Sequence, residues 1–379
     1  MNFEFSEEHL NVQQAARDFA QTELLPGVIE RDNKQEFPYE QVKKMGELGF
    51  LGIMVDPKYG GSGMDAVSYV LAMEELSKVD ASASVVVSVN NSLVCWGLET
   101  YGNEEQKQKY LVPLASGKCH GAFLLSEPEA GSDATSQRTT AFDMGDHYLM
   151  NGTKNWITNG NTATYYLVIA QTDVEKGHKG INAFIVEKSW PGVIIGKKED
   201  KMGIRGSDTH SIMFQDVKVP KENRIGDDGF GFKFAMKVLA GGRIGIAAQA
   251  LGIASGAYEL ALKYSKERKA FGKEIMHHQA IQFKLADMAT QIEAARLLCL
   301  KAAILKDEGK DYVLASSMAK VFASETAMWV TTEAVQIHGG YGYVKEYHVE
   351  RMMRDAKITQ IYEGTSEVQR IVISREILR

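Results

Sequence analysis

The spacing of apolar residues divides the chain into three stretches. Residues 1 to 118 carry apolar side chains at three- and four-residue steps, as in EEHLNVQQAARDFAQTELL and AVSYVLAMEELSKV, which is typical of amphipathic helices. From about 120 to 222 the pattern changes to short β-rich runs such as DHYLMNGTKNWIT, TYYLVIAQT and HSIMFQDVKV, with a turn signal at Asn151-Gly152. Helical spacing then returns and continues to the end of the chain. We therefore expect helices, strands and helices in that order.

Proline usage supports a long helical domain at the C-terminal end. All seven prolines lie at or before Pro220, and proline interrupts helices. The order of elements also argues against an alternating βαβ fold. The pattern predicts a multidomain α and β protein with an N-terminal helical domain (1–118), a middle antiparallel, barrel-like β domain (119–224) and a C-terminal helical bundle (225–379).

Charge and cysteine content exclude several classes of protein. A formal net charge of -6 and a pI of about 5.9 provide no overall attraction to nucleic acid or to an anionic membrane. Cys95, Cys119 and Cys299 are far apart, and none belongs to a CxxC pair, so we expect neither a disulfide framework nor structural zinc. No uninterrupted apolar run approaches the roughly 20 residues of a membrane span. An acidic, amphipathic N-terminus is unlike a signal peptide, so we expect a cytoplasmic protein, or a mitochondrial matrix protein without its presequence.

Familiar nucleotide and metal motifs are missing. The sequence contains no complete GxGxxG, P-loop, HExxH or EF-hand pattern, so neither a Rossmann domain nor a metal site is predicted. Six polar and glycine-rich clusters remain, each of which could alone be an ordinary loop. These are SEPEAGSD (126–133), NWITNG (155–160), GIRGSDT (203–209), ERKAFGK (267–273), QIHGGYGY (336–343) and IYEGTSE (361–367).

In this order, the six clusters resemble the acyl-CoA dehydrogenase family over essentially the whole chain. The run SVNNSL (88–93) is most similar to the short-chain, butyryl-CoA-type branch. The resemblance implies a C-terminal four-helix bundle, non-covalent FAD and a homotetramer built as a dimer of dimers. It also implies that a short-chain acyl-CoA is oxidised to the trans-2-enoyl-CoA, as in fatty-acid β-oxidation, with electrons passed to an electron-transfer flavoprotein.

The resemblance assigns one set of flavin contacts to the β domain. The indole of Trp156 would pack on the isoalloxazine and the hydroxyl of Thr158 would bond near N5, while Ser132 would also contact the CoA moiety. Taken alone, Trp156 is better explained as a core tryptophan on a strand. The set comprises Phe123, Leu125, Ser126, Ser132, Trp156, Ile157 and Thr158.

A second set of FAD contacts lies in the helical C-terminal part. In the family, Arg268 and Gln279 meet the FAD of a neighbouring subunit, and a guanidinium suits a pyrophosphate because it can donate to two oxygens. Glycines let the backbone approach the cofactor. The alternatives are a solvated cation at a helix end and a plain interhelical turn. The set comprises Arg268, Phe271, Gln279, Gln336, Ile337, Gly339, Gly340, Thr365, Ser366 and Glu367.

Glu363, in QIYEGTSEVQR, matches the catalytic base of the family. The resemblance implies that its carboxylate removes the pro-R α-proton of the thioester while the β-hydrogen leaves to the flavin. The thioester carbonyl would be held by the Glu363 backbone N–H and a ribityl hydroxyl, with Gly364 and Arg243 as further substrate contacts. The alternative is that Glu363 merely precedes a helix whose start is secured by a capping box of Ser366 and Gln369.

Departures from the family pattern narrow the substrate. Some members place the base at the position of Gly242, and the absence of a carboxylate in LAGGRIGIAAQ disfavours an isovaleryl-type or very-long-chain arrangement. Residues 81–95 contain no lysine or arginine, which disfavours a dicarboxylic substrate. Ala240 replaces an aspartate that helps to bind CoA, and Glu363 stands where nitroalkane-oxidising relatives have aspartate. A branched short-chain acyl-CoA dehydrogenase of amino-acid catabolism, or a flavin-binding protein that binds nucleic acid, remains the alternative.

Overall fold

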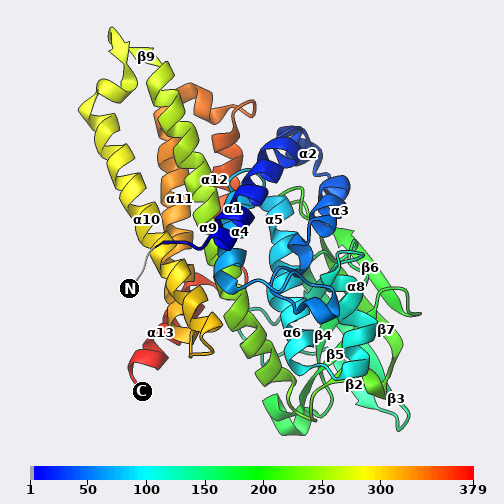
Figure 1. The fold of residues 1–379 in the computed structure, drawn as a ribbon. Coiled ribbons are helices and arrows are strands. Elements are labelled where there is room, and N and C mark those ends of the chain that lie inside the picture. The colour runs from blue at the N-terminus through cyan, green and yellow to red at the C-terminus, as the bar shows by residue number, and fades with distance from the viewer. Residues whose placement is uncertain (1–3) are drawn as a thin grey trace.

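Helices form both ends of the chain and a sheet forms its middle in the computed structural model, which describes residues 4–379 (Figure 1). This order of elements agrees with the prediction. Asp65 and Asp80 start two of the N-terminal helices by accepting hydrogen bonds from the first-turn N–H groups. The N-terminal helices are α1 Glu7–Phe19, α2 Val28–Lys34, α3 Tyr39–Glu47, α4 Ala66–Ser77, α5 Ala81–Ser88, α6 Trp96–Tyr101, α7 Glu104–Gln106 and α8 Val112–Ala115, with π-helical turns at Ala20–Leu24, Val89–Cys95 and Lys107–Leu111.

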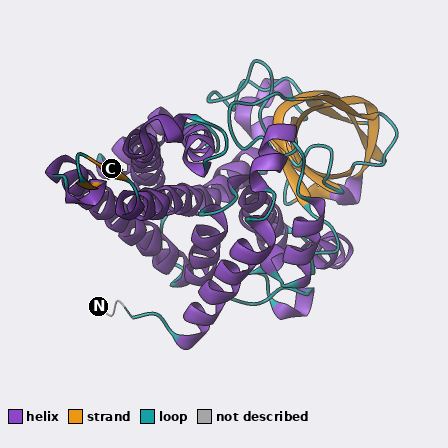
Figure 2. Ribbon diagram, turned by 90° about the horizontal axis from the view of Figure 1, so that it is seen from above, coloured by secondary structure: helices purple, strands orange, loops and turns teal. Residues whose placement is uncertain are grey.

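The middle segment forms an eight-stranded sheet that curves into a ring when seen from above (Figure 2). The order is β6-β7-β3-β2-β4-β5-β8, with β1 on β4. The prediction of a purely antiparallel sheet is wrong in part, because β1 and β2 each pair with β4 in parallel. The short strands β2 and β8 were also not anticipated. The strands are β1 Gly121–Leu124, β2 Thr140–Asp143, β3 His147–Thr158, β4 Tyr165–Gln171, β5 Ile181–Glu187, β6 Val193–Lys198, β7 Thr209–Pro220 and β8 Arg224–Ile225.

Three long helices dominate the C-terminal part and run side by side in Figure 1. The longest, α9, has glycines where other elements come close, and its residues 240–257 are buried throughout. A small hairpin of β9 and β10 lies at the far end of α9. The elements are α9 Gly231–Glu267, β9 Lys269–Ala270, β10 Lys273–Glu274, α10 Gln279–Asp307, α11 Val313–His338, α12 His348–Thr359 and α13 Ser366–Ile377.

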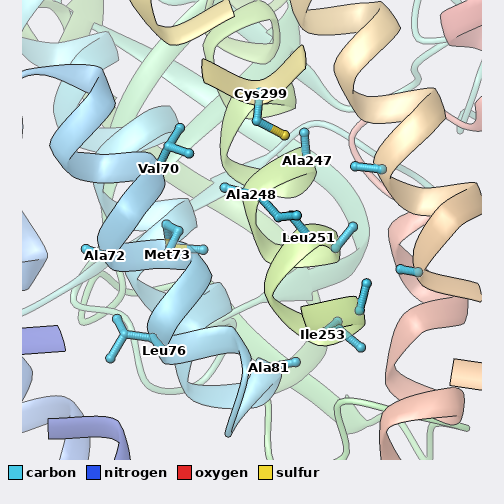
Figure 3. Close-up of a cluster of buried hydrophobic side chains, with 14 of the residues drawn as sticks. Val70, Ala72, Met73, Leu76, Ala81, Ala247, Ala248, Leu251, Ile253 and Cys299 are labelled. Atoms are coloured by element: carbon cyan, nitrogen blue, oxygen red, sulfur yellow. The ribbon is translucent and has the colours of Figure 1, made fainter. Parts of the chain in front are cut away.

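One hydrophobic core joins the N-terminal helices to the C-terminal helices. Figure 3 shows Val70 and Met73 of α4 packed against Ala248 and Leu251 of α9, with Cys299 of α10 beside them. Two helical stretches, Ala81–Tyr101 and Gly231–Glu267, have the length and hydropathy of a membrane span, but 94% of each apolar window is buried inside the protein. Their apolar character is therefore explained by the core that they form.

Candidate active site

Glu363 lies in the short segment between α12 and α13, facing α9. Its φ is +53° and that of Gly364 is +90°, so the chain reverses through two left-handed residues. The carboxylate points at Gly242, because a Cβ added at that glycine would collide with Glu363 Oε2. Oε2 is buried, and within residues 4–379 it has no hydrogen-bond partner. A carboxylate that points at bare helix backbone, without a partner, is available to accept a proton.

The surroundings of Glu363 shift the pKa of its carboxyl group close to neutral pH. Burial raises the pKa of Glu363 to about 7, while the positive charges of Lys320 and Arg243 act in the opposite direction. Arg243 is itself buried, its Nη1 donates to Ser317 Oγ at 3.1 Å, and burial lowers its pKa. The structure thus brings two predicted residues together, with Arg243 one residue beyond the glycine that Glu363 faces.

The predicted capping box of Ser366 and Gln369 is wrong. Thr365 is the N-cap of α13, and its hydroxyl accepts a hydrogen bond from Val368 N at 3.2 Å. Because Gly364 reverses the chain, Thr365 is the first extended residue, and Ser366 already belongs to the helix. Gln369 Nε2 instead donates to the carbonyls of Glu363 (3.2 Å) and Gly364 (3.0 Å). The start of α13 therefore holds the backbone of the candidate base.

The β-domain set of predicted flavin contacts gathers around a bulge in β3. The pairing of β3 with β7 shifts register between Lys154 and Ile157, and Trp156 lies in this irregularity with a φ of +61°. The bulge leaves 61% of Trp156 exposed, so the core-tryptophan alternative is wrong. Asn155 N donates to Ser126 O at 2.8 Å, which joins the bulge to the segment that holds the other members of the set.

The remaining members of the β-domain set differ in what they expose. Phe123 and Leu125 are partly buried and pack on the same hydrophobic cluster as Tyr362, the neighbour of the candidate base. The side chain of Ile157 is only 2% exposed and belongs to the interior of the sheet, so only its backbone could reach a cofactor. Thr158 ends β3 opposite Thr209. Ser126 is half-buried and Ser132 is exposed.

The second predicted set lies around an open hollow at the far end of α9. Arg268, Ile337, Gly339 and Gly340 line this hollow of about 530 Å³, and the Arg268 guanidinium lies 5.6 Å from the centre of the Tyr341 ring. A Cβ added at either glycine would meet nothing within 4 Å, so a ligand could approach the backbone there.

The other members of this set are exposed, apart from those at the start of α13. Phe271 is 95% exposed at the turn of the β9–β10 hairpin. Gln279, the first residue of α10, and Gln336 are also exposed. Thr365 and the buried Ser366 stand beside the candidate base instead, and Glu367 is exposed. The predicted set is therefore divided between the two ends of the bundle.

Each of the two sets offers groups that suit FAD. The β-domain set offers an exposed aromatic ring for a flat cofactor, and the Arg268 set offers a cation and an open glycine turn. At the rise of an α-helix, Arg268 lies about 39 Å from Gly242 along α9. Arg268 is therefore far from the stretch of α9 that the candidate base faces.

Comparison with known proteins identifies the family. The models for the acyl-CoA dehydrogenase N-terminal, middle and C-terminal domains match residues 6–118, 122–217 and 229–378. The chain belongs to the acyl-CoA dehydrogenase family. A short-chain specific acyl-CoA dehydrogenase of Clostridium acetobutylicum is 53% identical over 379 residues, covering 100% of both chains. Butyryl-CoA dehydrogenase from Megasphaera elsdenii superimposes with a TM-score of 0.99 at 52% identity, also over 100% of both chains.

A third relative is a chain from a structure described as "Electron transferring flavoprotein of Acidaminococcus fermentans: Towards a mechanism of flavin-based electron bifurcation". It covers 100% of both chains with a TM-score of 0.99 and 55% identity. As a member of this family, the protein is an FAD-dependent oxidoreductase, which confirms the predicted fold, cofactor and enzyme class.

Among residues 4–379, no group of three or more metal-ligating side chains is present.

Sequence patterns missed the side chains that support the candidate base. Neither Lys320 nor the hydrogen-bonding role of Gln369 was anticipated. Lys320 is far in sequence from the carbonyl that it binds, and Gln369 reaches the carbonyl of Glu363 only because the chain reverses before α13. One signal was available for Lys320. It is a charged residue in a helical run of small residues, LASSMAKVFAS, in which Ser316, Ser317 and Ala323 are all buried.

Proposed function

We propose that this acyl-CoA dehydrogenase oxidises short-chain acyl-CoA thioesters to trans-2-enoyl-CoA and passes the electrons to an electron-transfer flavoprotein. The short-chain specific relative, butyryl-CoA dehydrogenase and the electron transferring flavoprotein structure support this substrate class and this partner. The observation that carries the proposal is the placement of Glu363, whose buried and unpartnered carboxylate faces Gly242 on α9. No competing carboxylate occupies that stretch of helix.

Glu363 acts as the base that removes the pro-R α-proton of the thioester. With a pKa raised to about 7, a large fraction of the carboxylate is ionised at neutral pH, yet it remains basic enough to take a proton from a weak carbon acid. Within residues 4–379, the backbone N–H of Glu363 donates to no protein acceptor, so it is free to bind the thioester carbonyl. Arg243 and Lys320 stabilise the ionised carboxylate, and bound FAD accepts the two electrons of the oxidation.

The active assembly is a homotetramer, a dimer of dimers, in the cytoplasm or the mitochondrial matrix. The distance of about 39 Å along α9 between Arg268 and Gly242 supports sharing of each cofactor between chains, and the exposed Phe271 suits a partner surface. We also propose that each chain is divided into domains at the predicted limits, 1–118, 119–224 and 225–379. Sedimentation of the FAD-loaded protein should show four chains of 41.9 kDa each, and a monomer would contradict the shared site.

An anaerobic titration tests the function. The FAD-loaded protein is mixed with butyryl-, isobutyryl-, isovaleryl-, hexanoyl- or octanoyl-CoA, and loss of the flavin absorbance is followed. Butyryl-CoA should bleach the flavin fastest. Fastest bleaching by isobutyryl- or isovaleryl-CoA would support the branched-chain alternative, and no bleaching by any thioester would refute the dehydrogenase proposal.

A further inference from the structure

A buried lysine spans the two ends of the segment that carries Glu363. Lys320, on α11, is 0% exposed. Its Nζ donates to Thr359 O at 3.1 Å and to Gly364 O at 2.7 Å. Thr359 is the last residue of α12, and Gly364 directly follows Glu363. A single ammonium group therefore ties the segment of the base to the core of the helical bundle.

This segment needs such a support because its backbone conformation is unfavourable. Glu363 has a φ of +53°, which is uncommon for a residue with a side chain. Leaving its partly buried carbonyls unpaired would add a desolvation cost. Among residues 4–379, only Lys320 and Gln369 donate to the carbonyls of Glu363 and Gly364. Removing the lysine leaves Gln369 as the remaining donor to the Gly364 carbonyl.

Lys320 also places a positive charge near the carboxylate. The charged groups facing Glu363 are Lys320 from α11 and Arg243 from α9, and of these Lys320 has the larger effect in lowering its pKa. Burial lowers the pKa of Lys320 to about 8, and its ammonium group also interacts with the charges of Glu363, Arg243 and Glu367 of α13. Tyr69 of α4 and Tyr362 stay neutral, since burial raises the pKa of both phenols. Loss of Lys320 therefore removes the main partner charge of the base.

We propose that Lys320 is a positioning residue for the catalytic base, holding the Glu363 turn through two carbonyls and favouring the ionised carboxylate through its charge. The inference rests on the proposed role of Glu363. Lys320 itself touches neither the substrate nor the reacting atoms in this account. Its effect on the reaction is transmitted through the backbone of the turn and through the charge on the carboxylate.

The test compares Lys320→Met with Lys320→Arg in the FAD-loaded enzyme. The rate of flavin bleaching by saturating butyryl-CoA is measured anaerobically from pH 5.5 to pH 9. Lys320→Met should lower the rate by about 10- to 100-fold, as expected for a displaced catalytic group. Its rate should also rise with pH about one unit later than in the wild type, because the base has lost a neighbouring cation. Lys320→Arg keeps the charge and should retain the wild-type midpoint.

Lys306→Met is the matched control. Lys306 is another lysine whose pKa burial lowers to about 8, but it lies on α10 with its Nζ against Met54 Sδ, and it makes no contact with the turn. Its substitution should leave both the rate and the midpoint unchanged. A control variant that reproduced the slower rate and the shifted midpoint would overturn the assignment to Lys320.

Glu363→Gln distinguishes a failure of the inference about Lys320 from a failure of the assignment of Glu363 as the base. If Glu363→Gln is inactive while Lys320→Met keeps the wild-type rate and midpoint, the inference about Lys320 fails and the base assignment stands. Rapid bleaching by Glu363→Gln would overturn both. If Lys320→Met does not retain FAD, the shorter, neutral Lys320→Gln is used, and an unchanged midpoint in that variant would overturn the inference.

Discussion

Replacing Glu363 by glutamine should make the protein more stable at alkaline pH. Burial raises the pKa of Glu363 from 4.5 to about 7, so the folded protein holds this proton more tightly than the unfolded chain does. A group with a raised folded pKa contributes stability below its unfolded pKa, and that contribution disappears as the pH rises through the folded value. Above pH 7, the folded state therefore bears the cost of a buried negative charge that the charges of Lys320 and Arg243 offset only in part.

The size of the effect follows from the pKa difference. At 1.36 kcal/mol per pKa unit, the shift corresponds to about 3 kcal/mol at pH 8 and to less than about 1 kcal/mol at pH 5. Glutamine has nearly the same shape and no charge, so Glu363→Gln should recover most of this free energy at pH 8.

Denaturant unfolding of the FAD-loaded wild type and variant at pH 5 and pH 8 measures the difference. The control is Glu367→Gln, since Glu367 is an exposed acid in the first turn of α13 and has a lowered pKa. The control variant should gain no stability at pH 8. Equal stability of Glu363→Gln and wild type at pH 8, or a larger gain at pH 5 than at pH 8, would refute the account of the buried carboxylate.

Three further substitutions test the surroundings of the site. Gly242→Ala should slow flavin bleaching by butyryl-CoA at least about tenfold, because its Cβ would displace Glu363. The control is Gly241→Ala, whose Cβ would lie 3.7 Å from its nearest neighbour and which should not slow the bleaching. Lys154→Met should cost about 3–5 kcal/mol of stability, because the buried carboxylate of Glu127 loses the ammonium group that lies 2.7 Å from its Oε1 and keeps only backbone N–H donors. The variant should also bind FAD less tightly in an ultrafiltration assay, because Lys154 Nζ donates to the carbonyl of Leu125 in the predicted flavin-contact set. Unchanged stability and unchanged FAD binding would contradict this role of the ion pair. Thr365→Ala should cost about 1 kcal/mol in denaturant unfolding by removing the N-cap of α13, and a neutral result would show that the cap is dispensable.

The order of the three structural parts could be predicted from local signals. A proline-free C-terminal stretch and a change from helical to alternating spacing are properties of neighbouring residues, and they sufficed. Parallel pairing of β1 with β4 joins residues 121–124 to 165–168, so it depends on how the sheet curves rather than on either strand. The N-cap of α13 is Thr365 and not the predicted Ser366, because the left-handed Gly364 makes Thr365 the residue with the extended conformation before the helix.

The candidate base could be recognised from its motif, but its raised pKa and its supporting contacts could not be predicted from the sequence. The segment IYEGTSE identified Glu363 only through its resemblance to a family, and alone it suited a helix start equally well. The raised pKa comes from burial against α9, and the two carbonyl contacts of Lys320 join α11 to residues about 40 positions away. Such long-range contacts leave no local pattern beyond a lysine among small residues.

The most direct test of the central claim is the rate at which butyryl-CoA bleaches the flavin in wild type and in Glu363→Gln, measured under anaerobic conditions. Both proteins are loaded with FAD, and binding of butyryl-CoA to each is checked by equilibrium dialysis, so that only the proton transfer differs. The account predicts rapid bleaching of the wild type and binding without bleaching in the variant. Bleaching of the variant at a rate near that of the wild type would contradict the assignment of Glu363 as the base.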